Sequence, residues 1–284
     1  MATFSNRATL TYTGGTALSN VVTGEITEVL TVTKTAAGDT YRAIDTLTYV
    51  VTLLNSGTSP LTGLTLTDDL GAYPFGTGTL TPLTYVSDSL LYYTDGVLAA
   101  PPTLTSLSPL TLTGITVPAG GNATVVYRAA LNEFAPTASG ATVQNLVSVS
   151  GGGLTEPVTA TETVTVVDEA SLSITKSLSP LTVPENGEIT YTLLVANYGN
   201  TAADATDNVS ITDTFDPILS DITVTLDGVT LVAGTDYTYD EATGVFTTTP
   251  GRITLPAATL TQDPVTGAYT TVPATATLTV TGRI

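Results

Sequence analysis

The sequence contains no cysteine and no histidine, and these two absences exclude several kinds of chemistry. Without cysteine, no disulfide can hold the fold and no thiol can act as a nucleophile. Without histidine, the usual serine and cysteine hydrolase systems and the common zinc and copper sites cannot be built. The adjacent carboxylates Asp68 and Asp69 would face opposite sides of a strand, which suits a hydrolase poorly. We therefore expect no enzymatic turnover, no metal and no cofactor.

Positive charge is also scarce, because 7 Lys and Arg residues stand against 25 Asp and Glu residues, for a net charge of −18. A chain with this balance cannot neutralise phosphate groups, so we expect it to bind neither nucleic acid nor an anionic membrane surface. We find no N-terminal signal segment and no apolar run long enough to span a bilayer, so we expect either that a signal was removed or that export does not use one.

The residues that are abundant are those of β-strands. Thr, Val, Leu and Tyr alternate in short runs that Gly, Pro, Asn and Asp separate, and helical periodicity is missing. The 284 residues are enough for two domains. We predict an all-β chain with tandem β-sandwich domains at residues 28–167 and 168–284, preceded by a β-hairpin at residues 1–27.

The two domains are copies of one repeat, and each copy holds one of the chain's two lysines. The segment LTVTKT (residues 30–35) matches LSITKS (residues 172–177), and the match continues without a gap to Asn55 and Asn197. In both segments the lysine, Lys34 or Lys176, lies on the apolar side of the alternation. Because strand side chains alternate with period two, both lysines are expected to point into a core. The two asparagines precede turns and are expected to be turn residues.

The repeat is out of phase with the chain. The first copy ends in a hairpin over residues 143–166, which the second copy lacks, whereas residues 4–27 at the N-terminus resemble that hairpin. We predict that the N-terminal hairpin of one molecule completes the second domain of the next, which would produce a head-to-tail homopolymer. The alternative is an extra edge hairpin on the first domain. The donated residues expected to enter the core are Phe4, Ala8, Leu10 and Tyr12.

Each repeat also places an aspartate and an asparagine on apolar faces, together with its lysine. In the first domain the set is Lys34, Asp68 and Asn145; in the second it is Lys176, Asp213 and the Asn6 of a neighbouring molecule. A desolvated amine can attack the asparagine carboxamide while the acid assists loss of ammonia, which forms a Lys–Asn isopeptide bond. The alternative is an unreactive, hydrogen-bonded Lys–Asp pair. Asp69 has the opposite parity and is expected to be solvated.

These motifs resemble a conserved-repeat, immunoglobulin-like family of unknown function from bacterial and archaeal surface proteins. The lysine on the first strand and the asparagine on the last strand also resemble the isopeptide-forming domains of Gram-positive pili and adhesins. The resemblance implies immunoglobulin-like sandwiches, an extracellular location, and Asp68 and Asp213 as the assisting acids.

We therefore expect a structural subunit of an extracellular fibre, either pilus-like or a spore-surface appendage. Its polymer would be joined by strand donation and locked by the bonds Lys34–Asn145 within a subunit and Lys176–Asn6 between subunits. A spore appendage released by lysis would need no export signal. The alternative is a monomeric adhesin or surface-layer module that binds a ligand through its loops.

Overall fold

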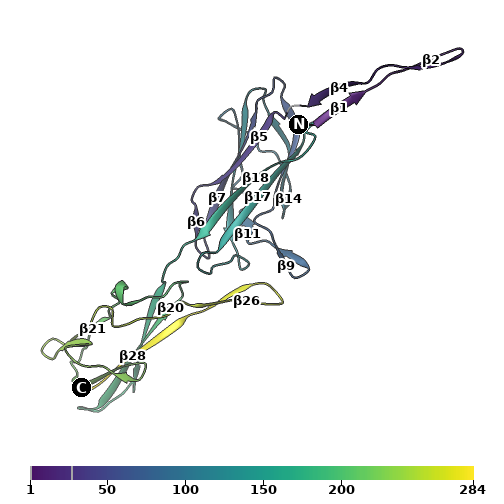
Figure 1. Cartoon of the computed structure of the whole chain (residues 1–284). Coiled ribbons are helices and arrows are strands. Elements are labelled where there is room, and N and C mark those ends of the chain that lie inside the picture. The colour runs from purple at the N-terminus through teal and green to yellow at the C-terminus, as the bar shows by residue number, and fades with distance from the viewer. Residues whose placement is uncertain (1, 27) are drawn as a thin grey trace. The chain divides into compact units, whose positions relative to one another are not determined.

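The computed structural model describes residues 2–26 and 28–284, so both end residues of the predicted N-terminal hairpin, 1 and 27, lie outside the described part. Figure 1 shows a chain built of strands, and the single helical element in the described residues is a 3-10 turn, η1 (Ala205–Asp207). The prediction of an all-β chain with immunoglobulin-like sandwiches is confirmed. No helix that could cross a bilayer occurs in the described ranges.

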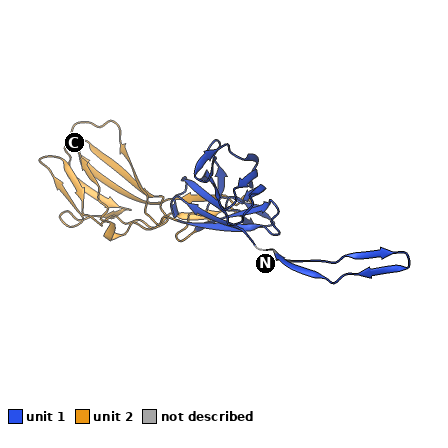
Figure 2. Ribbon diagram, turned by 90° about the horizontal axis from the view of Figure 1, so that it is seen from above, with its two compact units in different colours: residues 1–135, 142–165 blue, residues 136–141, 166–284 orange. Residues whose placement is uncertain are grey.

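The chain divides into two compact units, which Figure 2 colours separately. Unit 1 contains residues 1–135 and 142–165, and unit 2 contains residues 136–141 and 166–284. The short segment 136–141, which connects two strands of the first sandwich, therefore clusters with the second unit.

Unit 1 is a sandwich of two six-stranded sheets. In the first sheet the order is β13 (Val97–Ala99), β12 (Leu91–Thr94), β16 (Asn122–Leu131), β7 (Thr46–Asn55) and β5 (Leu30–Ala36), with β11 (Leu83–Tyr85) also paired to β16. In the second sheet the order is β14 (Thr103–Leu107), β15 (Leu110–Val117), β8 (Leu61–Asp68), β17 (Thr142–Gly151), β18 (Val158–Val166) and β6 (Thr40–Tyr41). A small ribbon is formed by β9 (Tyr73–Phe75) and β10 (Gly78–Leu80).

Period-two burial along these strands builds the core of unit 1. On β5, Leu30, Val32 and Lys34 are buried while the threonines between them are exposed. On β17, Asn145 and Val147 are buried in the same alternating way. The inward sides of the two sheets therefore face each other across the core, as the alternation predicts.

Unit 2 repeats this plan with fewer strands. Its main sheet has the order β19 (Leu172–Ser179), β20 (Glu188–Asn197), β28 (Ala274–Arg283), β22 (Ser220–Leu226) and β23 (Val229–Thr230). Its second sheet contains β21 (Thr212–Thr214), β25 (Val245–Thr248) and β24 (Tyr237–Asp240), and a separate hairpin contains β26 (Thr259–Gln262) and β27 (Tyr269–Val272). Lys34 pairs with Val51 and Lys176 pairs with Leu193 at the same repeat offset, so the two units share one register.

The N-terminal segment forms a two-stranded ribbon. β1 (Ala2–Asn6) pairs with β4 (Val22–Ile26), and β2 (Thr9–Tyr12) pairs with β3 (Gly15–Leu18). Between these pairs, two residues (7–8) stand opposite three (19–21), so the hydrogen-bond ladder of the ribbon is interrupted there. Its repeat equivalent β17 is one continuous strand. A two-stranded ribbon has no third strand to keep its ladder regular, and an extra residue on one side increases its twist. In the described structure neither half of the ribbon pairs with a sandwich strand.

Candidate cross-linking site and strand-acceptor groove

Lys34 lies in the core of unit 1 and is paired with Asp68. Its Nζ donates to Oδ2 of Asp68 at 2.6 Å, and both side chains are fully buried. The ammonium also lies 4.9 Å from the ring centre of Tyr49. Burial lowers the pKa of Lys34 from its ordinary value of 10.5, because desolvation outweighs the attraction of Asp68. The neutral, nucleophilic amine is therefore more accessible here than on an exposed lysine.

Asn145 lies at the other end of the same hydrogen-bonded cluster. The Tyr127 hydroxyl donates to Oδ2 of Asp68 and accepts a long bond of 3.5 Å from Nδ2 of Asn145. Oδ1 of Asn145 accepts from the backbone N–H of Gly71 at 3.2 Å. The structure thus connects Lys34, Asp68 and Asn145 through one shared set of contacts. The amide carbonyl already faces a backbone donor of the kind that stabilises an oxyanion.

Tyr127 is a member of this cluster that we did not identify from the sequence. It lies on β16, pairs with Tyr49 on β7, and stacks on it with ring centres 5.6 Å apart. Burial, reinforced by the nearby Asp68 carboxylate, raises the pKa of Tyr127 well above its ordinary value, so it remains a phenol. The alternation of Ala123, Val125 and Tyr127 in the segment NATVVYRAAL could have indicated its inward direction.

We expected Asp69 to be solvated because it follows Asp68 and should face the other side of the strand, but its side chain is bonded to the backbone. Its Oδ1 accepts backbone bonds from Gly71 and Leu146, each at 2.9 Å. Burial raises the pKa of Asp69. The bond to Leu146 joins the end of β8 to β17 directly beside Asn145, so the side chain holds this part of β17 in position. Period-two parity could not show this, because Asp69 follows the end of β8 where the backbone turns.

Asn55 and Asn197 form the same turn in both units. Oδ1 of Asn55 accepts from the N–H of Gly57 at 2.9 Å, and Oδ1 of Asn197 accepts from the N–H of Gly199 at 2.9 Å. Each Nδ2 donates to a carbonyl four residues ahead. Both asparagines are fully buried, so their role is to satisfy buried backbone groups at the end of the sandwich.

The second site contains the lysine and the aspartate but lies open. Lys176 pairs with Oδ2 of Asp213 at 2.5 Å, and its side chain is 39% exposed, against 0% for Lys34. Lys176 also lies 4.5 Å from the ring centre of Tyr191, the repeat equivalent of Tyr49. The asparagine assigned to this site, Asn6, lies on β1 of the same chain and pairs there with Val22. Within one molecule, the described contacts therefore do not complete the second set.

The strand that carries Asp213, β21, lacks one of the two neighbouring strands that its equivalent has in unit 1. In unit 1, β8 lies between β15 and β17, with Asp68 opposite Val147 and Leu66 opposite Val149. In unit 2, β21 is reduced to three residues and, among the described strands, pairs with β25 alone. The edge that β17 occupies in unit 1 is vacant in unit 2. An unpaired edge of this kind presents backbone groups to an incoming strand.

The same vacancy uncovers apolar side chains. Leu30 and Val32 are 6% and 7% exposed, whereas their repeat equivalents Leu172 and Ile174 are 41% and 52% exposed. A groove of about 200 Å³ opens here, and its lining residues are Leu172, Ser173, Ile174, Val195, Val209, Ser210 and Ile211. All of these residues belong to unit 2.

The N-terminal ribbon also exposes apolar side chains. Phe4, Leu10 and Tyr12 are 55%, 66% and 58% exposed. Their counterparts on β17 include Val143 and Val149, which are buried at 2% and 0%. Large apolar side chains that remain exposed on a short ribbon are typical of a surface that is covered in an assembly.

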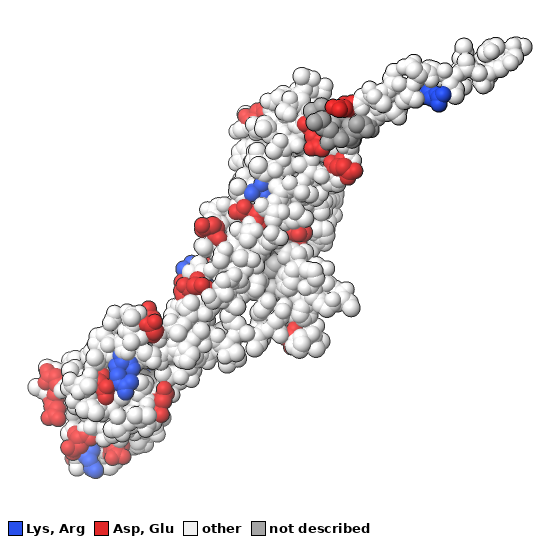
Figure 3. Space-filling model, in the orientation of Figure 1, with Lys and Arg blue, Asp and Glu red and all other residues white. Residues whose placement is uncertain are grey.

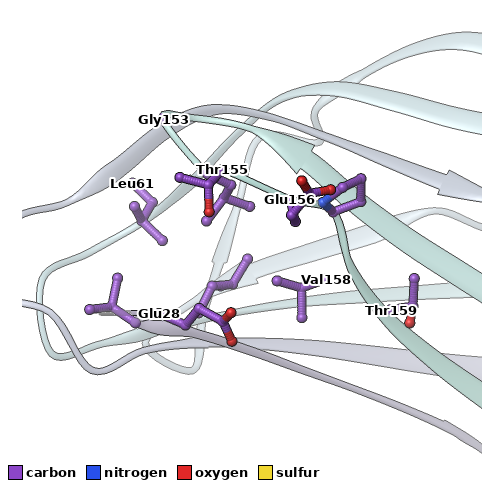
Figure 4. Close-up of a pocket in the computed structure, with 11 residues that line it drawn as sticks. Glu28, Leu61, Gly153, Thr155, Glu156, Val158 and Thr159 are labelled. Carbon is purple, nitrogen blue, oxygen red and sulfur yellow. The ribbon is translucent and has the colours of Figure 1, made fainter. Parts of the chain in front are cut away.

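A second cavity, of about 280 Å³, lies at the end of unit 1 (Figure 4). Glu28, Leu61 and the loop that joins β17 to β18, including Glu156, line it. In the ranges that the structure describes, no three acidic side chains gather closely enough to hold a metal. The same cavity is lined by Val29 and Leu30 at the start of β5.

The surface is mostly uncharged. On the face that Figure 3 shows, acidic groups are scattered among white surface and basic groups are few. The excess of acidic over basic groups agrees with the net charge of −18.

Comparisons with known proteins find distant similarities. No family model matches the chain, and no curated protein matches it. The pilus backbone protein RrgB of Streptococcus pneumoniae is 11% identical with a TM-score of 0.36, over 86% of this chain and 55% of that chain. BcpA, the major pilin subunit of Bacillus cereus, is 12% identical with a TM-score of 0.35, over 96% of this chain and 73% of that chain. A family 123 glycoside hydrolase from Clostridium perfringens is 13% identical with a TM-score of 0.29, over 45% and 22%.

The chain thus spans about half the length of the RrgB structure. Similarity as distant as this identifies no function, and both pilins and a hydrolase show it. A proposal for the function must therefore be based on the residues of this chain.

Tyr49 provides a first testable prediction for the site. Its side chain is fully buried, and its hydroxyl lies beside Asn145 without a hydrogen bond of acceptable geometry in the described structure. A buried polar group without a partner costs about 1–3 kcal/mol. We expect Tyr49→Phe to raise the urea midpoint of the full chain. Tyr127→Phe, which removes a bonded hydroxyl, should lower it, and a loss of stability in Tyr49→Phe would mean that its hydroxyl has a partner.

Proposed function

We propose that this chain is the structural subunit of an extracellular fibre on a cell or spore surface. Subunits join head-to-tail when the N-terminal ribbon of one copy enters the vacant edge of unit 2 in the next. The single observation that supports this most strongly is the paired exposure of Leu172 and Ile174 on one side and of Phe4 and Leu10 on the other. Both surfaces correspond to parts of unit 1 that are buried.

The occupant of the groove is identified by the repeat. β17 enters unit 1 with Val147 opposite Asp68 and Val149 opposite Leu66. With Asn6 placed as Asn145 is placed, Ala8 would stand opposite Asp213 and Leu10 opposite Ile211. Phe4 would then take the place of Val143. The incoming strand would fill the groove with apolar side chains and satisfy the free edge with main-chain hydrogen bonds.

This contact extends into a fibre because its two surfaces are different. The ribbon and the groove lie on different parts of one chain, so each added copy leaves one groove and one ribbon free. A protein of this kind acts by mechanical continuity, and we infer no enzymatic turnover.

Covalent bonds are the second part of the proposal. In unit 1, the contacts of Lys34, Asp68 and Asn145 support an internal Lys34–Asn145 bond. In unit 2, Lys176 and Asp213 already form a pair, and the arriving Asn6 would complete the set. The second bond would therefore close only after a neighbour has docked, and it would make the junction irreversible.

A matched pair of ribbon variants tests the assembly. Leu10→Asp would place a carboxylate in the neighbour's core, whereas Thr11→Asp would place it on the outward side, as Ser150 lies on β17. Leucine burial contributes about 1.5–3 kcal/mol, and a buried charge adds to the loss. Since each 1.4 kcal/mol is about tenfold in affinity, we expect Leu10→Asp to weaken assembly at least about 10²-fold.

Sedimentation and electron microscopy of the full chain provide the measurement. Thr11→Asp should form fibres like the parent chain, and Leu10→Asp should remain monomeric. Both positions are exposed in the free ribbon, so neither substitution disturbs the monomer. Equal assembly by the two variants, or a parent chain that is always monomeric, would reject strand donation and favour a monomeric surface module.

A further inference from the structure

Tyr127 occupies a position that the proposed chemistry does not yet use. Its hydroxyl contacts Oδ2 of Asp68 on one side and Nδ2 of Asn145 on the other. Lys34 binds the same Oδ2 of Asp68 at 2.6 Å. One continuous series of contacts therefore runs from the attacking nitrogen through the acid and the phenol to the leaving nitrogen.

The leaving group explains why such a series is useful. Amide nitrogen is a poor leaving group until it receives a proton, because it would otherwise depart as an amide anion. In this structure the carbonyl oxygen of Asn145 accepts from the N–H of Gly71 at 3.2 Å. A backbone N–H does not supply a proton to Nδ2, and the Tyr127 hydroxyl contacts this atom at 3.5 Å.

We propose that Tyr127 is the catalytic proton relay for the Lys34–Asn145 bond, carrying a proton from Asp68 to the departing amide nitrogen. This inference rests on the proposed isopeptide bond. The neutral Nζ forms a bond with Cγ of Asn145, and the carbonyl electron pair moves to Oδ1. Nζ gives a proton to Asp68, Tyr127 gives its proton to Nδ2, and Asp68 reprotonates Tyr127. The Cγ–Nδ2 bond then breaks and ammonia leaves, with Asp68 and Tyr127 restored.

The second unit supports this assignment by lacking the relay. Tyr127 pairs with Tyr49 on β7, and the residue that pairs with Tyr191 in unit 2 is Val280. Phe215 packs against Tyr191 with ring centres 5.0 Å apart, so an aromatic ring is present there without a hydroxyl. Among the described residues, Oδ2 of Asp213 accordingly has the ion pair with Lys176 but no phenol donor, whereas Oδ2 of Asp68 contacts both Lys34 and the Tyr127 hydroxyl. The internal bond therefore has a faster route than the bond between subunits.

The relay is tested by following bond formation in newly made protein. Full-length chain is synthesised in a cell-free system, stopped with acid at intervals, and digested with trypsin. A Lys34–Asn145 bond blocks cleavage at Lys34 and joins the peptide of residues 8–42 to the peptide that contains Asn145, with the loss of one ammonia. We expect Tyr127→Phe to slow the appearance of this joined peptide roughly 10²-fold, the usual contribution of a positioned proton donor.

Tyr92→Phe is the matched control, because it removes a buried hydroxyl of unit 1 that donates to the carbonyl of Thr116 at 2.7 Å and not to the Lys34–Asp68–Asn145 cluster. It should leave the rate unchanged. Equal rates for Tyr127→Phe and the parent chain would overturn the relay while leaving the bond itself established. A parent chain that never forms the joined peptide would reject the proposed bond, and the relay with it.

A second readout separates chemistry from folding. Site-specific incorporation of difluorotyrosine keeps the size and packing of the ring but makes the phenol more acidic. At position 127 we expect a faster rate, because a more acidic phenol protonates Nδ2 more readily. At position 92 we expect no change. A rate that does not respond at position 127 would also overturn the relay, even if Tyr127→Phe fails to fold.

Discussion

Boiling the assembled protein in detergent is expected to leave a ladder of covalent multimers, with each junction lighter by one ammonia molecule. The reason is the arrangement at Lys176, whose Nζ is already paired with Asp213 at 2.5 Å beside a vacant strand position. An arriving ribbon would place the carboxamide of Asn6 against this amine and exclude water. Holding two groups in contact in this way supplies the large effective concentration that amide exchange needs.

The variants Lys176→Arg and Lys34→Arg separate the two bonds. Arginine keeps the positive charge and the pairing with the aspartate, but its guanidinium is not a nucleophile. We expect Lys176→Arg to reduce the ladder to a single monomer band that still carries one internal bond. Lys34→Arg should keep the ladder and lose the internal bond, as intact mass would show. A boiled parent sample that contains only monomer of unreduced mass would contradict both bonds and leave strand donation as the sole junction.

The second large effect concerns the stability of unit 1. Replacing Lys34 with Met leaves the Asp68 carboxylate in a fully buried site without its cation. Removing one member of a buried ion pair typically costs about 3–5 kcal/mol. The Tyr127 hydroxyl and the N–H of Leu70 still donate to Asp68, but they do not supply a positive charge. In an Asn145→Ala background, where no Lys34–Asn145 bond can form, we therefore expect Lys34→Met to lower the free energy of unfolding of unit 1 by an amount in this range, measured by urea titration.

Two controls define the cause of that loss. Lys176→Met removes the equivalent lysine from a site that is 39% exposed, where water replaces the lost partner, so its cost in a monomeric background should be small. The double variant Lys34→Met with Asp68→Leu removes both charges and should recover much of the stability, since an apolar pair of similar volume is well tolerated in a core. A Lys34→Met chain as stable as its Asn145→Ala background would mean that the pair contributes nothing to folding.

The strands of the two sandwiches were predictable because their signal is local. Alternation along LTVTKT and LSITKS requires only that one side of each strand be buried, and the two copies support each other. The shared register of Lys34 with Val51 and of Lys176 with Leu193 follows from the same gapless match. The short β21 was less predictable, because strand length depends on how many neighbours supply hydrogen bonds, and one neighbour is absent.

The candidate site was predictable in its polar members and incomplete in its aromatic ones. A lysine, an aspartate or an asparagine on an apolar face contradicts the local pattern and is noticed at once. A tyrosine on such a face agrees with the pattern, so Tyr127 is indistinguishable from an ordinary core residue until its neighbours are known. Asp69 was misjudged for a related reason, because its partners are backbone N–H groups that carry no sequence signal.

The sequence by itself determined the all-β class, the two-fold repeat and the placement of Lys34, Asp68 and Asn145 on apolar faces, because each is a matter of period-two patterning and burial. Only the tertiary structure decided that Lys34 is enclosed while Lys176 is open, since unit 1 contains β17, a strand more than a hundred residues away from β5, and the described strands of unit 2 include no equivalent. It also decided which phenol contacts the carboxamide of Asn145, because hydrogen-bond partners are selected by packing across the two sheets and not along one strand.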